Sequence, residues 1–321
     1  MQFYSFVLLN QAAVSQDVFK MTVAKDSSGV PVSERFPHPA VGWSYENGQK
    51  AYEMMSCNDG LLDLYKVTGE QSNLKAVEMA VQDIIDEEIN IAGSGSAFEC
   101  WYKGAKYQDE PTYHTMETCV TMSWVKLCFN LLQITCNPAY ADEIEKLAYN
   151  ALLYSMKYDG SMIAKYSPMG GIRHKDEEQC GMHINCCNDN GPCAFMMLPR
   201  FAVTNATDGI YINIYCNGEA SIPHNSKDKV IITQETDYPL SDKIEITVNP
   251  EKPGVFTIAL RIPSWSRNTV LTINGEAIPE VTPAIVLARD AWFKDGFVYE
   301  SAVIRDQGGY VDLKPSASKP P

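Results

Sequence analysis

The chain has 321 residues, 45% of them hydrophobic, which is enough to bury a core and to form two domains. Its formal net charge is −14, and its 26 lysine and arginine residues form no run. We therefore expect neither a nucleic acid nor an anionic membrane surface as a partner, whereas neutral ligands such as sugars fit this charge.

The cysteine content and the hydropathy indicate the compartment. The ten cysteines are too unevenly spread for a disulfide scaffold, and a working thiolate needs a reducing compartment or protection by a metal. No segment reaches the roughly 18 to 20 apolar residues of a membrane helix. The first fifteen residues, MQFYSFVLLNQAAVS, lack the basic flank of a signal peptide. We expect a cytoplasmic rather than a secreted protein.

Helical periodicity dominates the first two thirds of the chain. Residues 1–48 contain three prolines that break any long helix. Apolar residues at helical spacing then predict a helix that ends at Gly69 and a second that starts at Ser72, joined as an antiparallel hairpin. Further helices are predicted at about 113–134, 139–157 and 191–201, with strands and loops over 161–187. Residues 1–204 are therefore predicted to be a helix-hairpin (α/α) domain.

The pattern changes beyond Asp208, where apolar and polar residues alternate as in a strand. The segments KVIITQE, KIEITV, VFTIALRI and TVLTIN predict further strands, and Asn274-Gly275 predicts a hairpin turn. Residues 205–321 are therefore predicted to form an antiparallel β-sandwich with a disordered tail, KPSASKPP.

Two separated segments carry residues that can bind a metal. Glu117 and Cys119 lie two positions apart, and Cys186 and Cys187 are adjacent. Three thiolates and one carboxylate fill a four-coordinate zinc shell. Residues i and i+2 point to different sides of a helix, so we expect an irregular helix entrance at the first segment and a loop at the second. By spacing alone, a buried thiol pair or a vicinal disulfide explains the cysteines equally well.

Glu99 is a further candidate, because it follows a Gly/Ser-rich loop among aromatic residues. Apolar neighbours favour the protonated carboxyl that a general acid needs, and the ring of Trp101 could stack on a sugar. His114 and His183 flank the metal-binding segments and could contact a substrate or support the metal ligands. A solvated loop glutamate and structural histidines are the alternatives.

Several strings occur in an order typical of one family: GWSYENGQKAYEMMSCNDGLLDLYKVTGE, METCVTMSW, YNALLYSMKYDG, AKYSP, CGMHINCCNDNGP and ALRIPSW. Together they resemble glycoside hydrolase family 127, the β-L-arabinofuranosidase-like proteins. The resemblance implies a partial (α/α)6 helical toroid followed by a β-sandwich. It also implies Zn²⁺ as the cofactor and retaining hydrolysis of non-reducing-end β-L-arabinofuranosides, with an oligosaccharide or glycoconjugate as the substrate.

The same resemblance assigns roles to residues. Four would hold zinc, namely Glu117, Cys119, Cys186 and Cys187. Cys186 would also be the nucleophile, and Glu99 would match the general acid/base that precedes the Glu-x-Cys element. Tyr166 of AKYSP resembles an active-site tyrosine.

Two departures from the family pattern leave other functions open. The family's barrel begins well before the position that Gly42 matches, so we expect a chain that lacks most of the N-terminal helices. Relatives also place further strands between INGEAIPEV and TPAIVLARD, so an unpaired sheet edge is expected. The alternatives are a truncated, inactive relative that binds carbohydrate or a partner chain, and a protein with a purely structural zinc site.

Overall fold

The computed structural model describes residues 50–108, 114–169, 186–207, 209–223, 228–241, 243–252 and 255–266, and beyond these only the backbone of strands up to residue 315. The predictions made for residues 1–48, for His183 and for the end of the tail lie outside the described residues. The chain divides into two compact units. The first ends at Met196, and the second begins at Met197 and also takes in Cys136–Asp142, whereas the sequence suggested a boundary at residue 204.

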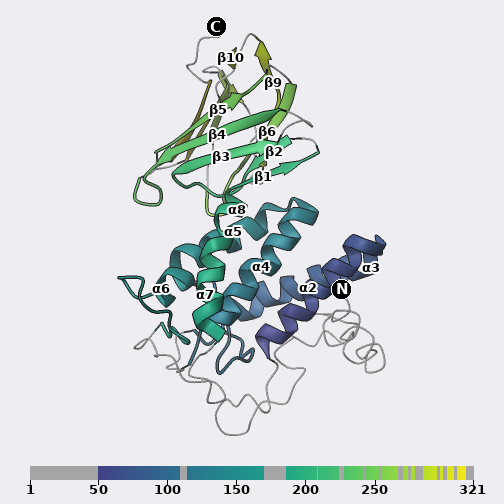
Figure 1. Cartoon of the computed structure of the whole chain (residues 1–321), viewed down its shortest axis with the longest axis vertical. Helices are drawn as coiled ribbons and strands as arrows, with labels where there is room; N and C mark the ends of the chain where they lie inside the picture. Colours follow the sequence, from purple (N-terminus) through teal and green to yellow (C-terminus); the bar gives the residue numbers. More distant parts are fainter. Residues whose placement is uncertain are drawn as a thin grey trace. The chain divides into compact units, whose positions relative to one another are not determined.

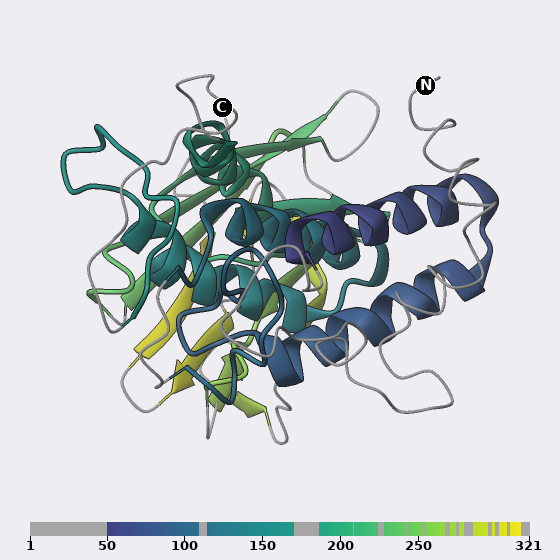
Figure 2. The same cartoon turned by 90° about the horizontal axis from the view of Figure 1, so that it is seen from below.

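A helix hairpin opens the described part of the first unit. Helix α2 (Ala51–Thr68) and helix α3 (Gln71–Asp83) lie side by side (Figures 1 and 2), and α3 continues into a π-helical turn, η2 (Ile84–Glu88). Helix α2 ends where the sequence predicts, because Gly69 adopts a left-handed φ of 71° and donates its N–H to the carbonyl of Tyr65 at 2.7 Å.

Helix α4 (Thr118–Thr135) supplies much of the core of this unit, since most of its side chains are buried. It begins about five residues later than predicted, because the residues before it are held in extended pairs. Thr115 pairs with Ala97, and Glu117 pairs with Tyr166. The other helices described before α7 are α5 (Pro138–Leu147), a second π-helical turn η3 (Ala148–Leu152) and α6 (Leu153–Ser155).

Helix α7 (Cys186–Met197) begins five residues earlier than predicted and is followed by the short α8 (Pro199–Ala202). The expectation that the cysteine pair lies in a loop is therefore wrong. The polar run Asn188-Asp189-Asn190 forms part of the first turns of the helix, where a carboxylate such as Asp189 is stabilised by the positive end of the helix dipole. Both cysteines occupy the first turn of α7.

The second unit contains two β-sheets. One has the strand order β1-β2-β6-β9-β10 and the other β3-β4-β5-β12-β11-β7-β8. Neighbouring strands are antiparallel as predicted, except that β2 pairs with β6 and β5 with β12 in parallel. The strand bounds are β1 Val203–Ala206, β2 Gly209–Ile212, β3 Gly218–Pro223, β4 Lys229–Thr236, β5 Lys243–Pro250, β6 Val255–Arg261, β7 Val270–Ile273, β8 Glu276–Ile278, β9 Ile285–Lys294, β10 Phe297–Val298, β11 Ala302–Asp306 and β12 Gly309–Pro315.

Apolar side chains from both sheets form one core, with Ile210 and Ile258 from the first sheet and Ile232 and Ile246 from the second. Strand β4 alternates buried side chains with partly or fully exposed ones along most of its length, as its sequence predicts. In the hairpin predicted at 274–275, Ile273 of β7 lies opposite Glu276 of β8. The fold is a helical region followed by mostly antiparallel strands. Among the described residues, no helix is both long enough and apolar enough to cross a membrane.

Candidate metal and catalytic site

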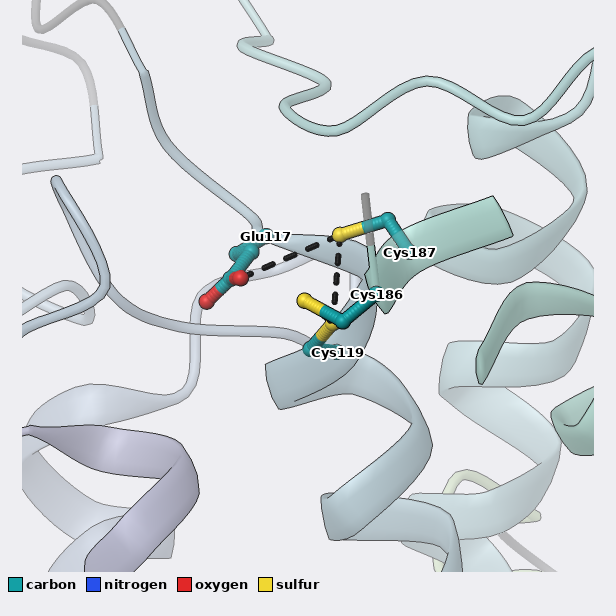
Figure 3. Close-up of side chains that lie close together, drawn as sticks. All are labelled: Glu117, Cys119, Cys186 and Cys187. Carbon is teal, nitrogen blue, oxygen red and sulfur yellow. Dashed lines mark hydrogen bonds between the residues drawn. The ribbon is translucent and has the colours of Figure 1, made fainter. Parts of the chain in front are cut away.

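Glu117, Cys119, Cys186 and Cys187 meet where helices α4 and α7 begin (Figure 3), and one ligand atom from each lies within 4.8 Å of the others. The Sγ atom of Cys119 is 2.9 Å from that of Cys186 and 3.2 Å from that of Cys187. Cys187 Sγ lies 3.8 Å from Glu117 Oε1. We call these four residues the thiol–carboxylate cluster.

Backbone pairing explains how two residues at i and i+2 reach the same point. Glu117 lies in an extended pair with Tyr166, whereas Cys119 is already inside α4. The N–H of Thr118 donates to the carbonyl of Lys165 at 3.0 Å, and the Thr118 hydroxyl donates to the carbonyl of Ala164 at 2.7 Å. The helix entrance is therefore irregular, as the sequence argument required, and it is fixed against residues 164–166.

The start of α7 supplies the other two thiols. Asn190, one turn further along this helix, donates from Nδ2 to Cys119 Sγ at 3.0 Å. The first turn of a helix presents backbone N–H groups without helical partners and the positive end of the dipole, and both stabilise a thiolate. Because Cys119 lies in the first turn of α4 and the cysteine pair in that of α7, all three thiols are in such positions.

The electrostatics of the cluster favour a cation. Burial, with smaller contributions from Glu99 and Cys186, raises the pKa of Glu117 to about 8. Hydrogen bonds to Cys186 and Cys187, together with burial, raise the pKa of the Cys119 thiol well above its usual range. Within the described part of the chain, the buried Oε2 of Glu117 has no hydrogen-bond partner. A cation would satisfy this atom and replace the protons of the thiols, so the cluster could bind a metal ion.

Exposure distinguishes the four members. Glu117 and Cys119 are each 2% exposed and Cys187 is fully buried, whereas Cys186 is partly exposed. A closed shell is typical of a structural metal site, and an open position is typical of a catalytic one. Cys186 is therefore the most exposed member of the cluster.

Glu99 lies in a charged environment rather than the apolar one that the sequence predicts. Its side chain, which is 22% exposed, forms an ion pair with Lys50 through Oε2 and a second with Lys165 through Oε1, at 3.3 Å. The hydroxyl of Tyr166 lies 3.5 Å from the same Oε1. Both oxygens of the carboxylate thus contact an ammonium group.

The aromatic neighbours of Glu99 point elsewhere, which explains the difference. Phe98 stacks on His114 with 4.5 Å between ring centres, and His114 meets Tyr166 edge-on at 4.9 Å. Trp101 is fully buried and donates its Nε1–H to the sulfur of Met54 at 3.1 Å, so its ring has no face open to a sugar. Of the predicted substrate-binding residues, Tyr166 lies beside Glu99, His114 lies edge-on to Tyr166, and His183 falls outside the described residues.

Sequence reasoning missed Lys50, Lys165 and Asn190. Lys165 directly precedes Tyr166 in the motif AKYSP, so its position beside a candidate active-site residue was a signal that could have found it. Asn190 follows Cys186 by four positions and therefore shares a helix face with it, but this signal is usable only once α7 is known to begin at Cys186.

Comparison with known proteins places both halves of the chain in one family. The model described as "β-L-arabinofuranosidase, GH127 catalytic domain" matches residues 37–199, half of the chain, and the model of the GH127 middle domain matches residues 209–292. A curated relative, the non-reducing end β-L-arabinofuranosidase of Bifidobacterium longum subsp. longum, is 21% identical over 258 residues. That match covers 75% of this chain and 37% of the relative.

Solved structures share the fold. The GH127 β-L-arabinofuranosidase of Geobacillus stearothermophilus T6 aligns with a TM-score of 0.59 at 21% identity, over 81% of this chain and 41% of that one. A second GH127 β-arabinofuranosidase aligns with a TM-score of 0.65 at 21% identity, over 81% and 45%. The chain thus spans less than half the length of these relatives. With both domain models matched in order, the chain belongs to the GH127 family of glycoside hydrolases.

Proposed function

We propose that the chain carries the catalytic site of a retaining glycoside hydrolase that acts on non-reducing-end β-L-arabinofuranosides or a related furanoside. The observation that supports this most directly is the thiol–carboxylate cluster, in which Cys186 is partly exposed while its three neighbours are buried. A purely structural metal site would instead be closed on all sides.

The cluster suits zinc. Soft thiolates select Zn²⁺ among common divalent ions, and four donors match its tetrahedral preference. The ligands would be Glu117, Cys119, Cys186 and Cys187. When bound, zinc would keep the thiols deprotonated near neutral pH.

The chain's own residues then account for two displacements. Cys186 Sγ attacks the anomeric carbon, the bond to the leaving oxygen breaks, and Glu99 gives that oxygen a proton. A glycosyl thioether on Cys186 results. Glu99 next takes a proton from water, the water oxygen attacks the same carbon, and the carbon–sulfur bond breaks to release the thiolate. Two displacements at one carbon retain its configuration, with sulfur in place of the usual carboxylate nucleophile.

The resemblance to this family also implies a particular fold. We propose that the α2–α3 hairpin and the later helices are part of an (α/α)6 toroid, and that the two sheets form a β-sandwich. The helix hairpin and the shared apolar core of the two sheets support this, as does the fold likeness to the GH127 structures.

Metal analysis and turnover by matched variants test the function. The unmodified chain is expected to contain equimolar zinc and to hydrolyse 4-nitrophenyl β-L-arabinofuranoside. Cys186→Ala should abolish turnover, because the nucleophile is lost. Cys193→Ala is the matched control, since Cys193 is exposed on the same helix and lies outside the cluster. It should leave both zinc content and turnover unchanged.

The other functions give different outcomes. A chain that binds zinc but neither binds nor hydrolyses the sugar would indicate a structural site. Sugar binding without turnover would indicate an inactive relative. A metal-free protein in which Cys186→Ala keeps full activity would contradict the proposal outright.

A further inference from the structure

The mechanism above leaves Lys165 without a role, although this lysine lies between Glu99 and the thiol–carboxylate cluster. Its side chain is only 9% exposed. The ammonium nitrogen lies 3.3 Å from Glu99 Oε1 and 5.1 Å from the ring centre of Tyr166. A lysine is rarely buried to this degree unless its charge is paired, and here the partner is the carboxylate of Glu99.

The main chain of Lys165 contacts the metal-binding segments. Its carbonyl oxygen accepts the N–H of Thr118 at 3.0 Å, at the start of α4, and lies 3.9 Å from Cys187 Sγ, at the start of α7. One residue therefore contacts Glu99 through its side chain and both helix starts through its carbonyl. Movement of Lys165 would change the distance between the carboxylate and the nucleophile's helix.

The ion pairs of Glu99 indicate which of the two displacements Lys165 assists. Lys165 contacts one oxygen of Glu99 and Lys50 the other, so an ammonium group holds each carboxylate oxygen. In the second displacement one of these oxygens must point at the attacking water to take its proton. The Lys50 side chain is 26% exposed, so solvent screens its charge more than that of Lys165. Among the described residues, Tyr166 also faces this carboxylate, and Glu117 and Cys187 also face Lys165.

We propose that Lys165 is a positioning residue that holds the carboxylate of Glu99 in place as the base for hydrolysis of the glycosyl thioether. The proposal rests on the function proposed above. In this step the proton of water passes to Glu99, the water oxygen binds the anomeric carbon, and Cys186 leaves as a thiolate. Lys165 neither gives nor takes a proton.

An aryl glycoside isolates this step, because a nitrophenolate leaves without needing an acid and kcat then reports hydrolysis of the intermediate. On 4-nitrophenyl β-L-arabinofuranoside, Lys165→Met is expected to lower kcat on the order of tenfold to a hundredfold, the range typical of a misplaced catalytic group. Azide attacks without a base, so it should restore the rate and give the glycosyl azide. Lys165→Arg should keep most of the rate, and Lys66→Met, which removes an exposed lysine paired with Asp63, should keep all of it.

A second measurement checks the contact without relying on turnover. A carbodiimide joins a carboxylate and an amine in contact as an amide, and the water that is lost converts the carbodiimide to its urea. Peptide mapping of the treated chain should find Glu99 joined to Lys165 and to Lys50. In Lys165→Met, Lys50 should be the partner found.

The outcomes separate the two proposals. An unchanged kcat in Lys165→Met, or a loss that azide does not restore, overturns the role of Lys165 and leaves the proposed function standing. A chain that cross-links Glu99 to Lys50 but never to Lys165 overturns it as well. Absence of turnover by the unmodified chain overturns the proposed function, and the role of Lys165 falls with it.

Discussion

At the scale of single residues, Glu117 combines burial with a position among thiols. Its carboxyl is almost inaccessible to water, and one of its oxygens lacks a hydrogen-bond partner within the described residues. Ionising such a group without a cation costs free energy, which explains why its pKa is raised from 4.5 to about 8. A bound cation would reverse that preference, so the stability of the chain should depend on metal and on pH together.

The pH dependence of the metal-free chain has a defined sign. A group whose folded pKa is raised stabilises the fold below its unfolded value of 4.5, and this contribution is lost as the pH rises towards about 8. We expect the free energy of unfolding of metal-free protein to fall across this window, as measured by urea titration at several pH values. Glu117→Gln cannot ionise, so it should remove most of the slope. An equal slope in this variant would contradict the assignment.

The same substitution tests metal binding. Glu117→Gln replaces an anionic ligand by a neutral amide of the same shape. Its zinc affinity, measured by competition with a chromogenic chelator, should fall by more than the roughly 10- to 100-fold typical of residues that only support a ligand. Cys193→Ala should retain the affinity of the unmodified chain. An unchanged affinity in Glu117→Gln would exclude the carboxylate as a ligand.

At the scale of elements, the two π-helical turns hold the loop that carries Glu99. The carboxylate of Glu88, at the end of η2, accepts the N–H groups of Tyr102 at 2.9 Å and Lys103 at 2.8 Å. From η3, Ala151 donates its N–H to the carbonyl of Ala92 at 3.1 Å. π turns frequently occur at functional sites. Here they fix both ends of the loop around Glu99.

Glycine substitutions test the contact between η2 and this loop. A Cβ atom added at Gly104 would lie 2.4 Å from the backbone carbonyl oxygen of Glu88, which cannot move cheaply. Gly104→Ala should therefore destabilise the fold by about 1–3 kcal/mol. Gly60, inside α2, has no atom within 4 Å of an added Cβ, so Gly60→Ala should stabilise by up to about 1 kcal/mol. Chemical denaturation of the two variants should give shifts of opposite sign.

At the scale of the whole molecule, the second unit includes a segment distant in sequence. Cys136–Asp142 groups with the strands, and the buried guanidinium of Arg261 donates to the carboxylate of Asp142 and to the carbonyl of Asn213. The same guanidinium lies 5.9 Å from the ring centre of Tyr215. These contacts fix the beginning of α5 within the second unit.

Removing the cation would leave Asp142 partly buried without its partner. Arg261→Met is expected to lower the stability of the fold by about 3–5 kcal/mol, and adding Asp142→Asn should recover part of that loss. Lys252→Met removes an exposed lysine that pairs with Asp228, and should lower the stability far less than Arg261→Met does. Thermal denaturation followed by circular dichroism can compare the three variants, and similar losses in all of them would contradict the role of the buried pair.

Local sequence patterns predicted most helices and strands. The features that they missed depend on contacts between residues far apart in the sequence. Helical spacing with a terminal glycine located the end of α2 at Thr68, and alternation located β4 and β5. The start of α7 was missed because its polar first turns resemble a loop. Residue spacing alone did not decide whether Glu117 and the three cysteines share a metal site. The resemblance to the family motifs turned this possibility into a prediction. The ion pairs of Glu99 with two lysines depend on contacts across 49 and 66 positions, which no local pattern contains.

Helix α5 begins in the second unit and ends in the first, so the two units share one continuous element. No single cut in the gene separates them, because residues 136–142 would remain with the helical part. Recombination that joined this helical unit to a foreign β domain would remove the strands with which the first half of α5 is grouped. Expression of residues 1–196 alone would likewise leave Asp142 without Arg261, so we expect the first half of α5 to be less stable in this fragment than in the full chain.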